Sequence, residues 1–138
     1  MLYQMYEFVG NHWSLVGAFL MVLAMFIYSE QRKKGQSINT AELSRLVNKE
    51  DAIVIDLRDS GEFRKGHIVD SKNIPNAKLT ERLSELESHK DKPIILVCPM
   101  GQLSGTAGGV LLKAGFTQVL RLAGGIGTWR GENLPLVK

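Results

Sequence analysis

Cys98 is the residue whose side chain is best suited to covalent chemistry, and it is the only cysteine among the 138 residues of the chain. It stands in the stretch LVCPMGQLSG, residues 96–105, where an apolar run ends and a loop with a glycine begins. A thiol attacks as its thiolate, so a reactive cysteine needs surroundings that favour negative charge. A buried thiol at the end of a strand is instead a small, inert hydrophobic group.

The loop after Cys98 has two features that favour an anion. A helix N-terminus offers free N–H groups and the positive end of the helix dipole, and a loop whose successive N–H groups turn inward offers a similar nest. Gly101 allows the positive φ that such a turn needs, and Ser104 is expected to cap the helix that follows. Pro99 opposes this arrangement because it removes one N–H group. This pattern alone leaves both interpretations of the cysteine open.

Short apolar runs alternate with helical patterns over residues 40–138. Residues 52–56 read AIVID and residues 93–97 read PIILV, and the second run is apolar throughout, as in a strand covered on both faces. This alternation predicts an α/β domain with a mostly parallel sheet. Two shorter strands are expected at residues 72–75 and 118–122, and helices at residues 40–48, 60–66, 78–90 and 104–116. Thr40 is expected to cap the first of these helices, and the third has Leu79, Leu83 and Leu86 on one face.

Two of these expected strands end in residues whose side chains could take part in binding or catalysis. Asp56 and Arg58 follow the first run, and Cys98 follows the second. In a parallel sheet the ligand site lies beyond the carboxyl ends of the strands. We therefore expect these three side chains at one edge of the sheet, which favours a functional cysteine.

The N-terminal part contains a long apolar segment. Residues 15–28 have no polar group except the Tyr28 hydroxyl, and extension back to Val9 gives twenty residues. A helix of that length covers about 30 Å, the thickness of a hydrocarbon core. A cleaved signal peptide would need positive charge before the run and small residues after it, and a buried helix is not needed by a domain that looks complete. The sequence therefore predicts an uncleaved transmembrane helix at about 9–28.

Three basic residues, Arg32 to Lys34, follow this expected span. Because cytoplasmic flanks carry Lys and Arg, we expect a single-pass protein of the inner (plasma) membrane with its N-terminus outside and its domain in the cytoplasm. The polar residues that come next show no periodicity and are expected to form a linker. The expected division is an N-terminal segment at 1–28, a linker at 29–39 and a domain at 40–138.

The composition excludes several kinds of site. The net charge is only +3, with no basic stripe and no interleaved aromatic residues, so nucleic acid is not an expected partner. One cysteine allows neither an internal disulfide nor a Cys-rich metal cage. His67 and His89 show no metal-ligand spacing with Cys98, and His67 is expected to fix a turn. We expect no metal and no cofactor.

Three stretches carry motifs in an ordered series. Residues 54–75, VIDLRDSGEFRKGHIVDSKNIP, combine Asp-x-Arg, Glu-Phe, Gly-His-Ile and Asn-Ile-Pro. Residues 96–116, LVCPMGQLSGTAGGVLLKAGF, combine a strand, Cys-x-x-Gly, a serine and a helix that ends in Gly-Phe. Residues 119–136, VLRLAGGIGTWRGENLPL, contain Gly-Gly, a tryptophan and a closing proline. In this order and at these spacings the motifs resemble those of rhodanese domains, over about residues 40–136.

This resemblance implies a three-layer α/β fold and a cysteine that carries sulfane sulfur as a persulfide. Cys98 would be the nucleophile, taking sulfur from thiosulfate or another sulfane donor and passing it to a thiol acceptor. Asp56 and Arg58 would border the site as structural support. The N–H groups that would hold the persulfide or the donor anion belong to Met100, Gly101, Gln102, Leu103 and Ser104.

One position departs from the family pattern. Active rhodaneses often carry a basic residue five positions after the cysteine, where this chain has Leu103. Without that charge thiosulfate should bind weakly, and the thiolate should be less favoured. Tyrosine-phosphatase-like loops need an arginine one position later to clamp phosphoryl oxygens, and Ser104 stands there.

Two functions are therefore open. The first is a membrane-anchored sulfurtransferase that works through a persulfide on Cys98, with a sulfane-sulfur donor and a thiol acceptor as partners. The second is a non-catalytic rhodanese-like binding module that recruits a partner, such as a membrane protein, to the lipid bilayer. Leu103 and Pro99 favour the second function, whereas Cys98, Gly101 and Ser104 favour the first. Redox sensing by the thiol has no separate support.

Overall fold

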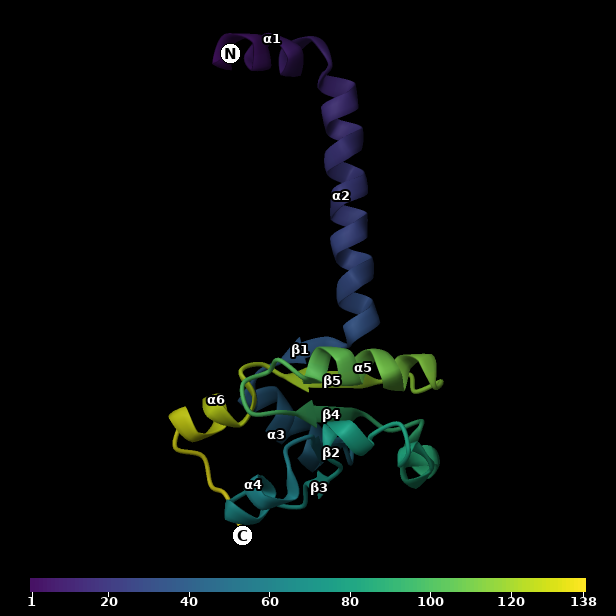
Figure 1. Ribbon diagram of the computed structural model, residues 1–138, viewed down its shortest axis with the longest axis vertical. Coiled ribbons are helices and arrows are strands. Elements are labelled where there is room, and N and C mark those ends of the chain that lie inside the picture. The colour runs from purple at the N-terminus through teal and green to yellow at the C-terminus, as the bar shows by residue number, and fades with distance from the viewer. The chain divides into compact units, whose positions relative to one another are not determined.

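The computed structural model describes residues 1–30 and 35–138 with their side chains (Figure 1). The chain divides into two compact units, Met1–Arg32 and Lys33–Lys138. Helices α1, Leu2–Asn11, and α2, Trp13–Lys34, make up the N-terminal part. The sheet and the remaining helices belong to the second unit.

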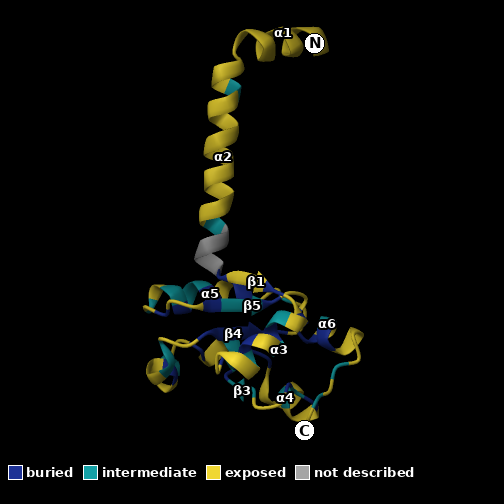
Figure 2. Ribbon diagram, turned by 180° about the vertical axis from the view of Figure 1, so that it is seen from behind, coloured by how far each residue is buried: buried dark blue, intermediate teal, exposed yellow. Residues whose placement is uncertain are grey.

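The N-terminal helix is interrupted at His12, whose φ of −125° and ψ of 36° leave the helical region. The His12 N–H group donates to the Phe8 carbonyl at 3.0 Å, the ring Nδ1 lies 3.1 Å from the same oxygen, and the two rings stack. The long helix therefore begins at Trp13 rather than at Val9. Its stretch Trp13–Glu30 has a mean hydropathy of 1.6, is unburied, and is long and apolar enough to cross a membrane (Figure 2).

The expected linker at 29–39 falls partly on residues 31–34, which lie outside the described residues. In its described remainder, α2 includes Ser29 and Glu30, and strand β1 occupies Gln36–Ile38. β1 has no apolar run, because only Ile38 among its three residues is buried. A strand therefore stands where an irregular connection was expected.

The second unit is built on a five-stranded sheet in the order β1-β5-β4-β2-β3. Every pairing is parallel, as the alternation of strands and helices predicted. The central strand β4 is buried along its whole length, which explains its uninterrupted apolar run. Besides β1, the strands are β2, Ile53–Asp56, β3, Lys72–Asn73, β4, Ile94–Val97, and β5, Val119–Leu122.

Helical segments and apolar side chains cover both faces of this sheet. On one face α5, Ser104–Lys113, and the 3-10 helix η2, Leu83–His89, enclose a core that includes Leu96 and Leu111. On the other face α3, Thr40–Lys49, and α6, Gly125–Gly131, enclose a core that includes Val97 and Trp129. The fold is therefore the predicted three-layer α/β domain. Its two short helical segments are α4, Ser60–Lys65, and η1, Asn76–Lys78.

Two local predictions were wrong. The α-helix expected at 78–90 is instead made of 3-10 turns, and at three residues per turn Leu83, Leu86 and His89 fall on one side. Thr40 does not cap α3, because Asn39 precedes it and its Oδ1 accepts the Glu42 N–H at 2.8 Å.

Candidate functional site

Strand β4 determines where the Cys98 side chain points. Side chains alternate along a strand, and Ile94 and Leu96 pack in the core beneath α5. Cys98 continues that alternation and belongs to the same core, with an exposed fraction of 0%. The thiol of the resting protein is therefore shielded from water at the carboxyl end of β4.

The loop from Pro99 to Leu103 connects this thiol to α5. Gly101 has a φ of +86°, the left-handed conformation that the sequence predicted for the turn. Within the part of the chain that the structure describes, the N–H groups from Met100 to Ser104 donate no backbone hydrogen bond. The first N–H groups of a helix have no partner inside the helix, so unpaired donors continue from the loop into α5.

Ser104 closes this loop rather than capping the helix. Leu103 occupies the N-cap position, and Ser104 is the first residue of α5. The Ser104 hydroxyl is buried and donates to the Gly101 carbonyl at 3.1 Å. Its expected role as a cap is therefore wrong, because the hydroxyl reaches back across the turn instead of forward to the helix N–H groups.

The loop is held by the turn that leads into α6. The Ile126 N–H group donates to the Cys98 carbonyl at 2.9 Å, and the Gly127 N–H group donates to the Pro99 carbonyl at 3.0 Å. Gly125 has a φ of +59°, and a Cβ added there would lie 2.0 Å from the Cys98 oxygen. Glycine is therefore required where the α6 turn packs on the backbone of the cysteine. Sequence reasoning missed this contact, although the pair Gly124–Gly125 after an expected strand was a signal for it.

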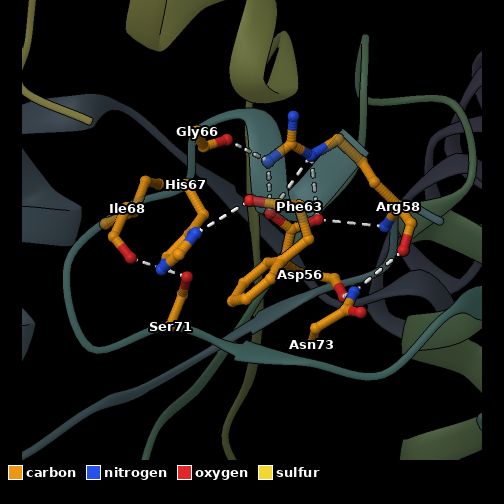
Figure 3. Close-up of polar contacts among 8 residues, drawn as sticks. All are labelled: Asp56, Arg58, Phe63, Gly66, His67, Ile68, Ser71 and Asn73. Atoms are coloured by element: carbon orange, nitrogen blue, oxygen red, sulfur yellow. Dashed lines mark hydrogen bonds and ion pairs between the residues drawn. The ribbon is translucent and has the colours of Figure 1, made fainter. Parts of the chain in front are cut away.

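Asp56 and Arg58 form a buried ion pair (Figure 3). Arg58 Nη2 lies 2.8 Å from Asp56 Oδ2, and Arg58 Nε lies 3.0 Å from Oδ1. The guanidinium also donates to the Gly66 carbonyl at 2.7 Å, while the Asn73 amide donates to the carbonyls of Asp56 and Arg58. These bonds connect β2 to β3 and to the turn that follows α4.

The strand register separates this pair from the thiol. Asp56 is paired with Val97, so its side chain lies on the Val97 face of the sheet, whereas Cys98 faces α5. Both sites lie at the same sheet edge, as expected. The geometry favours a supporting role for Asp56 and Arg58, because the carboxylate is already bonded and is directed to the opposite layer.

His67 holds the neighbouring turn in place. Its Nδ1 lies 2.8 Å from the Phe63 carbonyl, and its ring stacks on Phe63 with centroids 3.8 Å apart (Figure 3). Its backbone exchanges two hydrogen bonds of 2.8 Å with Val137. The expected turn-fixing role is confirmed.

The outer surface of the cysteine loop carries two exposed apolar side chains beside the exposed Gln102. Met100 is 68% exposed and Leu103 is 41% exposed, and no Lys or Arg lies in residues 99–103. An open groove between β1 and α3 is lined by other residues and includes none of this loop. Among the described residues, no three His, Cys, Asp or Glu side chains are grouped to hold a metal ion.

The structure has a parallel α/β sheet, a cysteine at the end of its central strand and an N–H-rich loop that leads into a helix. These features together define a class of α/β protein domains. A family model described as "Rhodanese-like domain" matches residues 39–132. The chain belongs to the rhodanese-like domain family.

Relatives and solved structures agree with this assignment. The "Uncharacterized protein YibN" of Escherichia coli (strain K12) is 43% identical over 136 residues, covering 96% of this chain and 95% of its own. The "Thiosulfate sulfurtransferase GlpE" of Pseudoalteromonas translucida is 36% identical and covers 67% of this chain and 86% of its own. A crystal structure of a rhodanese-related protein from Thermoplasma volcanium has a TM-score of 0.67 and 33% identity, covering 74% of this chain and 97% of its own.

Proposed function

We propose that the protein is a membrane-anchored sulfurtransferase in which Cys98 carries sulfane sulfur as a persulfide. The observation that carries this proposal is the run of unpaired N–H groups from Met100 to Ser104, directly after a cysteine at the end of β4. Unpaired donors of this kind bind anions. The similarity to a relative named as a thiosulfate sulfurtransferase gives independent support.

The proposed transfer has two steps. The Cys98 thiolate attacks the outer sulfur of a donor R–S–S⁻, the donor S–S bond breaks, and R–S⁻ leaves while Cys98–S–S⁻ forms. An acceptor thiolate then attacks that outer sulfur and releases the Cys98 thiolate. Each step exchanges one S–S bond for another, so no external oxidant or reductant is needed. The loop N–H groups would hold the terminal sulfur while it is anionic.

The donor that fits this loop is a persulfide of an organic thiol rather than thiosulfate. Thiosulfate carries two negative charges, and the loop from Pro99 to Leu103 contains no cation. Without a cation, the loop can hold a dianion only through neutral N–H groups, and no opposite charge offsets the two negative charges. The exposed Met100 and Leu103 side chains offer apolar contact to the organic part of a thiol donor.

The anchor is proposed from α2. Its stretch Trp13–Glu30 meets the length and hydropathy that a single span requires. The basic residues Arg32 to Lys34 follow it, whereas Glu7 is the only charged side chain before it. By the positive-inside rule the rhodanese-like domain would face the cytoplasm.

A non-catalytic binding module is the second candidate. The specific observation in its favour is the complete burial of Cys98, because a donor can reach the sulfur only after the loop has moved. The exposed apolar pair Met100 and Leu103 would then serve as a contact for a protein partner at the membrane rather than for a sulfur donor.

Intact mass spectrometry separates these two functions. The full chain in mild detergent is incubated with glutathione persulfide or with thiosulfate, beside Cys98→Ser. A sulfurtransferase gains one sulfur atom on the native chain alone, more completely from the persulfide, and loses it when a thiol acceptor is added. If neither donor adds sulfur although the unfolded chain can be alkylated at Cys98, the sulfurtransferase proposal is wrong and the binding module is favoured.

A further inference from the structure

Helix α1 has two contrasting sides. Leu2, Met5, Tyr6 and Val9 follow the spacing of one helix face. The opposite face carries Gln4, Glu7 and Asn11. None of the ten residues of α1 is buried, so within the described part of the chain no protein covers the apolar face (Figure 2).

The connection to α2 fixes where α1 must be if α2 crosses a bilayer. Only His12 separates the end of α1 from Trp13, where the apolar span begins. One residue reaches at most about 3.6 Å. The carboxyl end of α1 therefore lies at the bilayer surface, on the side opposite the rhodanese-like domain.

The length of α1 excludes a second crossing. Ten residues give a helix of about 15 Å, about half the thickness of the hydrocarbon core. A helix this short is marginal in water by itself and gains its stability from burying an apolar face. A surface position in the membrane buries that face without requiring another protein.

The side chains of α1 fit the boundary between headgroups and acyl chains. Tyr3, Tyr6 and the adjacent Trp13 are of the types that concentrate at membrane interfaces. The helix has no Lys or Arg, and Glu7 is its only charged side chain. Its binding energy would therefore come from apolar burial, with no attraction to anionic lipid.

We propose that α1 is a membrane-surface helix that buries the Met5 and Val9 side in the lipid interface and leaves Glu7 in water. The inference rests on the proposed anchor and adds a second lipid contact to it. By lying in the plane of the surface, α1 fixes the depth and the rotation of the span.

Single-cysteine labelling of the full chain tests this arrangement. In a Cys98→Ser background, Met5→Cys and Val9→Cys report the apolar face, while Gln4→Cys and Glu7→Cys report the polar face. Each variant carries an environment-sensitive fluorophore in phosphatidylcholine vesicles at high lipid excess. The apolar-face labels should show blue-shifted emission, quenching by nitroxide lipid and loss of iodide quenching, and the polar-face labels should show the reverse. Adding phosphatidylglycerol should not strengthen the protection.

A label at Leu20→Cys, inside the span, distinguishes the failure of this inference from the failure of the anchor. If Leu20 is protected while all four α1 labels are open to iodide, the anchor stands and the surface helix is refuted. If Leu20 is also open, the anchor itself is wrong. The labels at Met5→Cys and Val9→Cys could also lose their protection from iodide when more lipid is added and the protein is diluted in the membrane. That result would mean that a second copy of the chain covers the apolar face, which also refutes the proposal.

Discussion

At the scale of single residues, Leu103 leaves the cysteine loop without a positive charge. It is 41% exposed and stands five positions after Cys98, where the family pattern often has a basic residue. The loop then depends on its N–H groups, and the proposed preference for an organic persulfide follows from this one side chain.

Leu103→Arg should convert the site toward thiosulfate. A charge-assisted hydrogen bond contributes about 1.5 kcal/mol or more, which is about tenfold in affinity. We expect kcat/KM for thiosulfate to rise by about that factor, measured as sulfite release, and Leu103→Gln provides an uncharged control. No rise in Leu103→Arg, in protein that still accepts sulfur from glutathione persulfide, would show that charge at this position does not limit donor choice.

Gly125→Ala should disrupt the support beneath Cys98. The new Cβ would lie 2.0 Å from the Cys98 oxygen, and φ there is +59°. The left-handed conformation alone costs about 1 to 2 kcal/mol for a residue with a Cβ. We expect a lower Tm by circular dichroism and a slower gain of sulfur.

Gly131→Ala is the matched control in the same helix, since a Cβ there meets nothing within 4 Å. Equal Tm values for the two variants would contradict the packing of the α6 turn on the cysteine backbone.

Much of this site could be predicted from the sequence, but its burial could not. The position of Cys98 after an apolar run and the turn at Gly101 were both visible in the residue order. The Gly124–Gly125 pair indicated a tight turn, but not its contact with Cys98, because that contact joins residues far apart in the chain across a crossover. Ser104 was misassigned because a serine at the start of a helix can occupy the cap or the first turn, and the sequence does not distinguish them.

At the scale of elements, the Asp56–Arg58 pair connects β2 to the turn after α4. The two residues are 1% and 4% exposed. Removing one partner of such a pair leaves the other charge buried and unpaired. The pair therefore supports the end of the sheet where the strands have their carboxyl termini and where the cysteine loop begins.

Arg58→Ala should lower the free energy of unfolding by about 3 to 5 kcal/mol, since it leaves the Asp56 carboxylate buried without its partner. Urea unfolding in mild detergent, followed by circular dichroism, measures this loss. Arg45→Ala removes an exposed ion pair with Glu42 and should cost less than about 1 kcal/mol. Similar losses in both variants would argue against the buried pair as a structural connection.

Apolar runs predicted the central strands, and the short pattern at residues 72–75 predicted the edge strand β3, but the other edge strand, β1, was missed. β2 and β4 were found because they are apolar over four or more residues, whereas β1 was missed because Gln36 and Ser37 are exposed. The leucine spacing around Leu83 and Leu86 indicated a helical segment but not its type. Periods of 3.0 and 3.6 residues are too close to distinguish over such a short stretch.

At the scale of the whole molecule, α2 is proposed to keep the rhodanese-like domain at the cytoplasmic surface. The basic residues Arg32 to Lys34 provide the argument for this orientation. A tether confines the domain to sulfur donors and acceptors that reach the membrane.

External protease tests this orientation in cells that express the protein. In intact spheroplasts the domain should stay undigested, and it should be digested once the membrane is permeabilised. A periplasmic protein in the same sample controls for protease access. Digestion of the domain in intact spheroplasts would contradict the orientation.

The burial of Cys98 also bears on chemical damage. Peroxide oxidises accessible thiolates stepwise to sulfenic, sulfinic and sulfonic acids, and the last two steps are largely irreversible. A sulfur enclosed between β4 and α5 is out of reach of such reagents, and as the only cysteine it has no second thiol in its own chain to bond with. The resting protein should therefore keep its thiol reduced through oxidative stress and become vulnerable only while its loop is open.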